Sequence, residues 1–85
     1  MRNIYKFPLM PGDTIPLPAG AVPRLVANQL GIDCAWIEVQ TDAPARKHLV
    51  VKVGTGGNIA PDAMYLGTVL ECHGQFVWHY YLVPA

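Results

Sequence analysis

Prolines and glycines divide this chain into short β-rich runs, and no run shows a sustained apolar stripe at helical spacing. The sequence holds eight glycines and eight prolines in 85 residues. The β-rich runs cover residues 2–9, 24–30, 35–40, 48–54, 64–72 and 75–83. This pattern predicts a single domain, residues 1–85, that is mainly β: a small antiparallel β-sandwich or barrel of about six strands. It allows at most one short helical turn, from Asn58 to Ala63, with Asn58 as its cap.

The hairpin signal is clearest near the C-terminus. Two β-rich runs are joined by His73-Gly74, a two-residue turn whose glycine tolerates a positive φ angle. A direct hairpin at this turn places Gly67 opposite Tyr80, so that an aromatic ring covers a strand glycine. The sequence therefore predicts both the pairing and the register of the last two strands.

The last strand is apolar on both of its faces. One face holds Phe76, Trp78, Tyr80 and Leu82, and the other holds Val77, His79, Tyr81 and Val83. A strand of this kind lies between two layers of the domain or at an interface. We predict that the second group, which lies on the face opposite the large core aromatics, forms an interface.

The remaining runs are less sharply defined. Residues 10–23 hold four of the eight prolines, so this stretch is an edge strand, an extended loop or an arm exchanged between chains. Residues 24–30 and 35–40 suit a hairpin that turns near Gly31. In residues 48–54 the apolar side chains alternate, which predicts a strand with one face more buried than the other. Leu49, Val51 and Val53 share one face of that strand, and His48, Val50 and Lys52 share the other.

The composition indicates self-association. Hydrophobic residues make up 52% of the chain and charged residues only 14%, and a chain of this length buries a limited share of its surface. We therefore expect a homo-oligomer, most simply a dimer. Six basic and six acidic residues cancel, which argues against a nucleic-acid partner, because such proteins usually carry a basic stripe.

The expected location of the protein in the cell follows from its apolar runs, its N-terminal residues and its cysteines. No apolar run is long enough to cross a bilayer, so no membrane partner is expected. The N-terminal residues enter a strand-like segment directly and show no secretory signal. Cys34 and Cys72 are then expected to be free thiols in a reducing compartment, the cytoplasm.

One stretch has the composition of an anion-binding loop. It comprises Gly54, Thr55, Gly56, Gly57 and Asn58, with Arg46 and Lys47 earlier in the chain. Successive glycine N–H groups can form a nest for a phosphate. The spacing matches neither of the common nucleotide-binding glycine motifs, and no lysine follows. The simpler interpretation is a turn at the exit of a strand.

Nothing in the sequence forms a catalytic or metal-binding pattern. The chain has no serine, and its six acids are dispersed. Cys72 and His73 are adjacent and would point to opposite faces of a strand, and no C-x-x-C pair exists. We predict no catalytic residues, no metal and no cofactor, and hence a protein that is not an enzyme.

Nearly the whole chain is covered by four stretches: "IYKFPL", "TIPLPAGAVPRLVANQLGIDCAWIEV", "VGTGGNI" and "YLGTVLECHGQFVWHYYL". Their order, the glycines Gly54, Gly56 and Gly67, and the Val77-Trp78-His79 run resemble a family of small bacteriophage and prophage proteins of unknown function. The resemblance implies a phage origin and expression inside a bacterial host. It implies no activity, cofactor or catalytic residue.

Three functional hypotheses follow. The first is a self-associating interaction module that engages a host or phage protein. The second is a small-ligand protein that binds or sequesters a nucleotide through residues 54–58. The third is a minor structural component of a virion.

Overall fold

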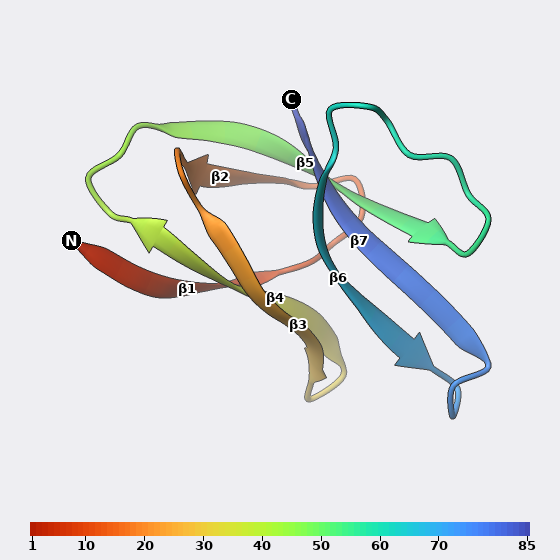
Figure 1. The fold of residues 1–85 in the computed structure, drawn as a ribbon. Coiled ribbons are helices and arrows are strands. Elements are labelled where there is room, and N and C mark those ends of the chain that lie inside the picture. The colour runs from red at the N-terminus through yellow and green to blue at the C-terminus, as the bar shows by residue number, and fades with distance from the viewer.

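The computed structural model describes residues 1–85 and contains seven β-strands and no helix (Figure 1). The strands are β1 (Arg2–Pro8), β2 (Thr14–Pro18), β3 (Val22–Gln29), β4 (Ile32–Gln40), β5 (Ala45–Gly54), β6 (Met64–Glu71) and β7 (Phe76–Pro84). The predicted mainly β class is confirmed. The strand beyond the expected six is β2, which lies in the proline-rich stretch.

The strands form two antiparallel sheets that pack as a sandwich (Figure 1). One sheet has three strands in the order β1-β4-β3, and the other has four in the order β2-β5-β7-β6. The chain passes from one sheet to the other three times, after β1, after β2 and after β4. The last three strands, β5, β6 and β7, therefore lie in the same sheet. Of the alternatives for residues 10–23, the structure contains an edge strand, because β2 pairs with β5 of the same chain.

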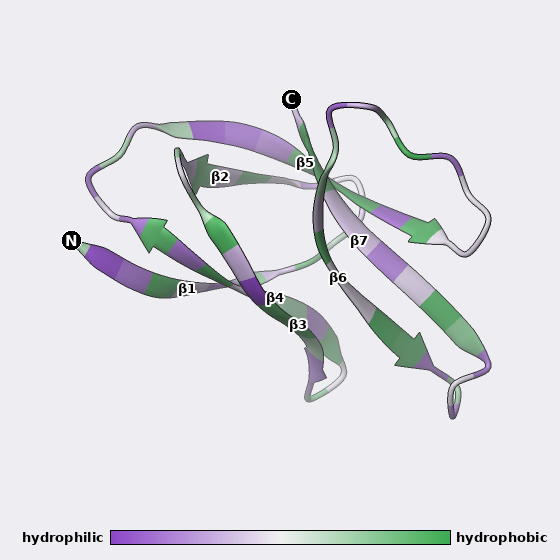
Figure 2. Cartoon of the chain, viewed as in Figure 1, coloured by the Kyte–Doolittle hydropathy of each residue, from purple (hydrophilic) through white to green (hydrophobic).

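The core lies between the sheets. From the three-stranded sheet it receives Ala35, Ile37 and Val39 of β4, which alternate along the strand as a period of two requires. The four-stranded sheet contributes larger side chains, among them Tyr80 and Leu82 of β7. This alternation is visible as green and purple or pale bands along the strands in Figure 2.

β5 points its less apolar face inward. Val50 is 1% exposed and belongs to the core, and Lys52 lies on the same side, while Val51 and Val53 lie on the outer face. The reason is the pairing of Val50 with Leu82 in β7, because directly paired residues share a face of the sheet. The loop between β5 and β6 packs on the outer face and half-buries its valines.

Both predicted hairpins are present. In the C-terminal hairpin Gly67 pairs with Tyr80, as predicted, and the Gln75 N–H donates to the Cys72 carbonyl at 3.1 Å. The turn between β3 and β4 is Leu30-Gly31, in which both residues have positive φ, 52° and 89°. A two-residue turn of that kind matches the twist of the strands it joins.

The segment from Asn58 to Ala63 forms no helical turn. Pro61 and Asp62 are the central residues of a β-turn, closed by the Ala63 N–H, which donates to the Ala60 carbonyl at 3.1 Å. Proline is favoured at the second position of such a turn because its ring presets φ. The turn lets the loop pass from the end of β5 to the start of β6.

Candidate functional site

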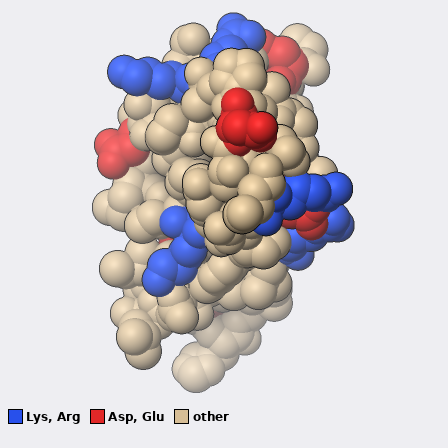
Figure 3. All heavy atoms as spheres, turned by 90° about the vertical axis from the view of Figure 1, so that its left-hand side faces the viewer, with Lys and Arg blue, Asp and Glu red and all other residues tan.

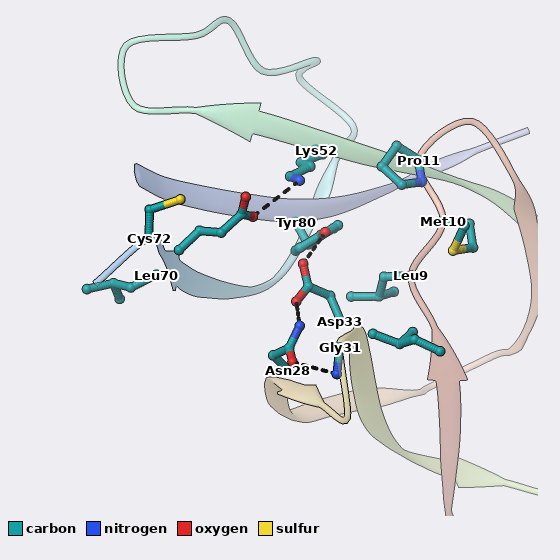
Figure 4. A pocket seen from close by; sticks show the side chains of 12 residues that line it. Leu9, Met10, Pro11, Asn28, Gly31, Asp33, Lys52, Leu70, Cys72 and Tyr80 are labelled. Carbon is teal, nitrogen blue, oxygen red and sulfur yellow. Dashed lines mark hydrogen bonds and ion pairs between the residues drawn. The ribbon is translucent and has the colours of Figure 1, made fainter. Parts of the chain in front are cut away.

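A groove opens at the end of the sandwich where the β3–β4 and β6–β7 hairpin tips lie, and Figure 4 shows the side chains that line it. Its volume is about 740 Å³, which is within the range of ligand and peptide sites. Both sheets and the β1–β2 connection line it. Binding residues often lie on loops that a rigid scaffold positions, and this is the largest concavity of the molecule.

A chain of hydrogen bonds forms the floor of the groove. The Tyr80 hydroxyl donates to one Asp33 carboxylate oxygen at 2.6 Å, and the Asn28 amide donates to the other at 2.9 Å (Figure 4). Burial, the hydrogen bond to Asp33 and the charges of Asp33 and Glu71 together raise the pKa of Tyr80 above its ordinary value of 10.0. Both Asp33 oxygens are engaged, so this carboxylate holds the two sheets together.

Lys52 and Glu71 lie on the same wall of the groove, which the four-stranded sheet forms, with 3.9 Å between the Lys52 Nζ and a Glu71 carboxylate oxygen (Figure 4). The Lys52 ammonium also lies 4.6 Å from the centre of the Trp78 ring, a cation–π contact. Phe76 stacks beside Trp78 at 6.3 Å and is 50% exposed. The inner face of the four-stranded sheet therefore continues into the groove as a surface that is apolar with one cation and one carboxylate.

Exposed aliphatic side chains surround this groove. Met10 is 54% exposed, Ile32 50% and Leu70 67%, and all three line it. Leu30 is 98% exposed in the turn beside Gly31, which is also a lining residue. We call Met10, Leu30, Ile32 and Leu70 the apolar rim. The sequence pattern did not predict the rim, although a leucine directly before a turn glycine was a signal for it.

The glycine loop forms a tight turn. The Gly57 N–H donates to the Gly54 carbonyl at 2.9 Å, and Gly56 has φ +90°, which a side chain rarely adopts. Thr55 Oγ1 lies 3.1 Å from His79 Nε2 and ties the turn to β7. One of the N–H groups that an anion nest would need is therefore already engaged.

Arg46 and Lys47 do not join this loop. They lie at the start of β5 and Gly54 lies at its end, a separation of about 26 Å along an extended strand. Arg46 instead borders a shallow cavity of about 240 Å³ beside His48 and Met64. The structure brings residues 54–58 together but leaves the two basic residues at the opposite end of the sheet.

The four residues predicted as an interface lie on the outer face of β7 and are half-buried. They are Val77, His79, Tyr81 and Val83. His79 is held from both sides, because Thr68 Oγ1 lies 2.9 Å from its Nδ1 and Thr55 reaches its Nε2. Residues 58–60 and Ala63 pack over Tyr81 and Val83. The chain's own β5–β6 loop therefore covers part of this face.

Other chemistry is sparse. Cys34 is buried and Cys72 is exposed, and both are free. No three His, Cys, Asp or Glu side chains lie close enough together to hold a metal ion. The structure has no helix of the length and hydropathy that a membrane crossing requires.

The comparison with family models spans the entire chain. Residues 1–85 match the model described as a domain of unknown function, DUF7352. The chain belongs to this family. No curated protein and no solved structure matches the chain significantly. The predicted membership of an uncharacterised family is thus confirmed, and the groove and its apolar rim are features of a DUF7352 domain.

Proposed function

We propose that this DUF7352 domain is a non-enzymatic interaction module that self-associates through the apolar rim. The four rim side chains are exposed around a groove whose lining is half hydrophobic, with 6 of its 12 residues apolar. Exposed apolar side chains that are grouped and rimmed by polar residues mark protein interaction sites. A second copy that packs against the rim would bury these side chains, and a dimer is the simplest closed assembly. The resemblance to phage proteins supports a role in a bacterial cytoplasm, with a host or phage protein as the final partner.

The main support for this proposal is the backbone conformation and the exposure of Leu30. Its φ of 52° is unfavourable for a residue with a branched side chain, and the turn would favour glycine or asparagine there. Its side chain is 98% exposed, so the monomer gains no burial in return. Backbone strain without a folding benefit is typical of residues that serve binding.

The free strand edges are poor alternatives for self-association. On β1, self-pairing centred on Ile4 would place Arg2 opposite Lys6 of the second copy, and Pro8 lacks an N–H. On β2, Pro16 and Pro18 remove two ladder donors. β3 and β6 face each other within the domain. Association at the hairpin end avoids all four edges.

The test is sedimentation equilibrium on the wild type, Leu30→Asn and Leu70→Asn. We expect the wild type to form a dimer and both variants to shift toward monomer by about tenfold in Kd, since each loses a buried leucine. In dilute protein Leu30→Asn should also raise Tm by roughly 2–6 °C, because asparagine tolerates the positive φ. A loss of association caused by unfolding would lower Tm instead.

Leu25→Asn is the matched control. Leu25 is 54% exposed on β3, away from the rim, so its replacement should leave the association unchanged. A wild type that stays monomeric at high concentration would refute the proposal. An equal effect of all three asparagine substitutions would refute the assignment to the rim.

A further inference from the structure

The outer face of the three-stranded sheet is an open surface with a tryptophan at its centre. In β4 the residues that alternate with the core positions point outward, and Trp36 is one of them. Trp36 pairs with Lys6 of β1 on one side and with Leu25 of β3 on the other. The next row along the sheet has the same form, with Glu38 between Ile4 and Val22.

The apolar side chains on this face are exposed. Ile4 is 49% exposed, Leu25 54% and Val22 37%, and β2 and β6, which contact β4, belong to the other sheet of the sandwich. Trp36 is half-buried by its neighbours. Tryptophan at the centre of a flat, partly apolar surface is the side chain that most often dominates the energy of a protein interface.

The same face is basic. It carries Arg2, Lys6 and Arg24, half of the six Lys and Arg residues of the chain, against a single acid, Glu38. The nearby carboxylate of Asp42 lies 3.8 Å from the N-terminal amine, which balances its charge. Figure 3 shows the side of the molecule on which β1 begins, where Lys and Arg side chains and fewer Asp and Glu side chains form small groups on an otherwise uncharged surface.

Glu38 holds the two arginines against the sheet. Its Oε1 accepts from Arg24 Nε at 3.1 Å and Nη2 at 2.9 Å, and its Oε2 pairs with Arg2. The Glu38 side chain is only 18% exposed, whereas those of Arg2 and Arg24 are 64% and 53% exposed. Both carboxylate oxygens are thus engaged, and the guanidinium N–H groups that they do not use are available on side chains held in a preorganised position.

We propose that this face binds an acidic, extended segment of another protein. Carboxylates of the segment would accept hydrogen bonds from Arg2, Lys6 and Arg24, and an apolar side chain between them would cover Trp36. Single-stranded nucleic acid fits less well, because it is usually held by several stacking aromatics and this face has one, flanked by aliphatic side chains. This proposal rests on the proposed interaction role and adds the chemistry of the partner. The partner would bind the outer face of the three-stranded sheet and not the apolar rim.

The experiment measures fluorescence anisotropy of a labelled peptide with glutamates on both sides of a central Leu-Val pair. A peptide with lysines in place of the glutamates and a labelled oligothymidylate are the comparison probes. We expect binding of the acidic peptide alone. Arg24→Gln and Lys6→Gln should each weaken it by about tenfold at low salt, since each removes a charge-assisted hydrogen bond. Trp36→Thr, which retains strand propensity, should weaken it as strongly.

Lys47→Gln is the matched control, because it removes the same charge from an exposed position on β5 in the other sheet. It should leave the affinity unchanged. The proposal would be overturned by no binding of the acidic peptide, by binding of the oligothymidylate in its place, or by an equal loss in the Lys47 and Arg24 variants. Leu30→Asn should bind the peptide normally, so a failure of self-association and a failure of this inference are distinguishable.

Discussion

The two sheets come close together at Gly67 because glycine has no side chain. A Cβ at this position would lie 2.7 Å from both Cβ and Cγ2 of Val26 in β3, which is closer than real atoms come. The φ angle of Gly67 is not in the left-handed region, so space and not backbone conformation requires glycine here. The sequence predicted the pairing of Gly67 with Tyr80 but not this contact, because Val26 lies in the other sheet.

Gly67→Ala should therefore destabilise the domain by about 1–3 kcal/mol, the usual cost of overpacking. Val26→Ala alone should also destabilise it, through lost burial and a small cavity. Val26→Ala removes Cγ2 but keeps Cβ, so the double variant relieves part of the clash, and its free energy of unfolding should exceed that of an additive sum. Urea unfolding of the four proteins measures this coupling, and strict additivity would contradict the contact.

At the scale of elements, β7 is the strand that joins the layers. Tyr80 is 2% exposed, and its hydroxyl crosses from the four-stranded sheet to Asp33 of β4. The period of two predicted that Tyr80 faces the core. It did not predict the partner, because Asp33 is 47 residues away in sequence and lies at a hairpin base that only the packing of the sheets brings near.

This bond predicts a loss of stability at alkaline pH. The pKa of Tyr80 is raised in the folded state, so above pH 10 the unfolded chain loses its Tyr80 proton while the folded chain keeps it. The stabilisation that comes from the raised pKa of Tyr80 is fully present below pH 10. Above pH 10 the free energy of unfolding should fall by about 1.4 kcal/mol per pH unit.

The Tyr80→Phe variant should lack this fall in stability at alkaline pH, because it has no hydroxyl to titrate. At neutral pH it should be less stable than the wild type by about 1–3 kcal/mol, because Asp33 loses a hydrogen-bond donor. Urea unfolding of both proteins between pH 7 and alkaline pH checks the prediction. Parallel pH profiles for the wild type and the phenylalanine variant would contradict it.

For the whole molecule, zero net charge removes the long-range repulsion that would oppose association. The two proposed surfaces should then respond oppositely to salt. Raising NaCl from about 50 to about 500 mM should leave the rim-mediated dimer unchanged or tighter, since apolar contacts are not screened. The same change should weaken acidic-peptide binding severalfold. Sedimentation and anisotropy in matched buffers measure the two responses, and parallel weakening would contradict the assignment of an apolar and a basic surface.

The sequence by itself determined six of the seven strands, the two hairpins and the alternation of faces along β7. These features depend on contacts between neighbours in the chain: a turn sets the register, and a period of two assigns each side chain to a face. The register of the final hairpin was therefore predicted from its turn as far as the pair of Gly67 and Tyr80, but not the bulge between Tyr65 and Gly67 that shifts the pairs beyond it. The same local information placed Gly54 to Asn58 in a turn.

Only the tertiary structure decided which strands share a sheet and which surfaces the sandwich leaves open. The alternation in β5 predicted two faces, but the pairing with β7 turned Val50 inward and left Val51 and Val53 outside. Arg46 and Lys47 were separated from the glycine loop by the length of one strand. The groove and the basic face combine residues from distant parts of the chain, because the burial of apolar surface between two sheets acts without regard to sequence separation.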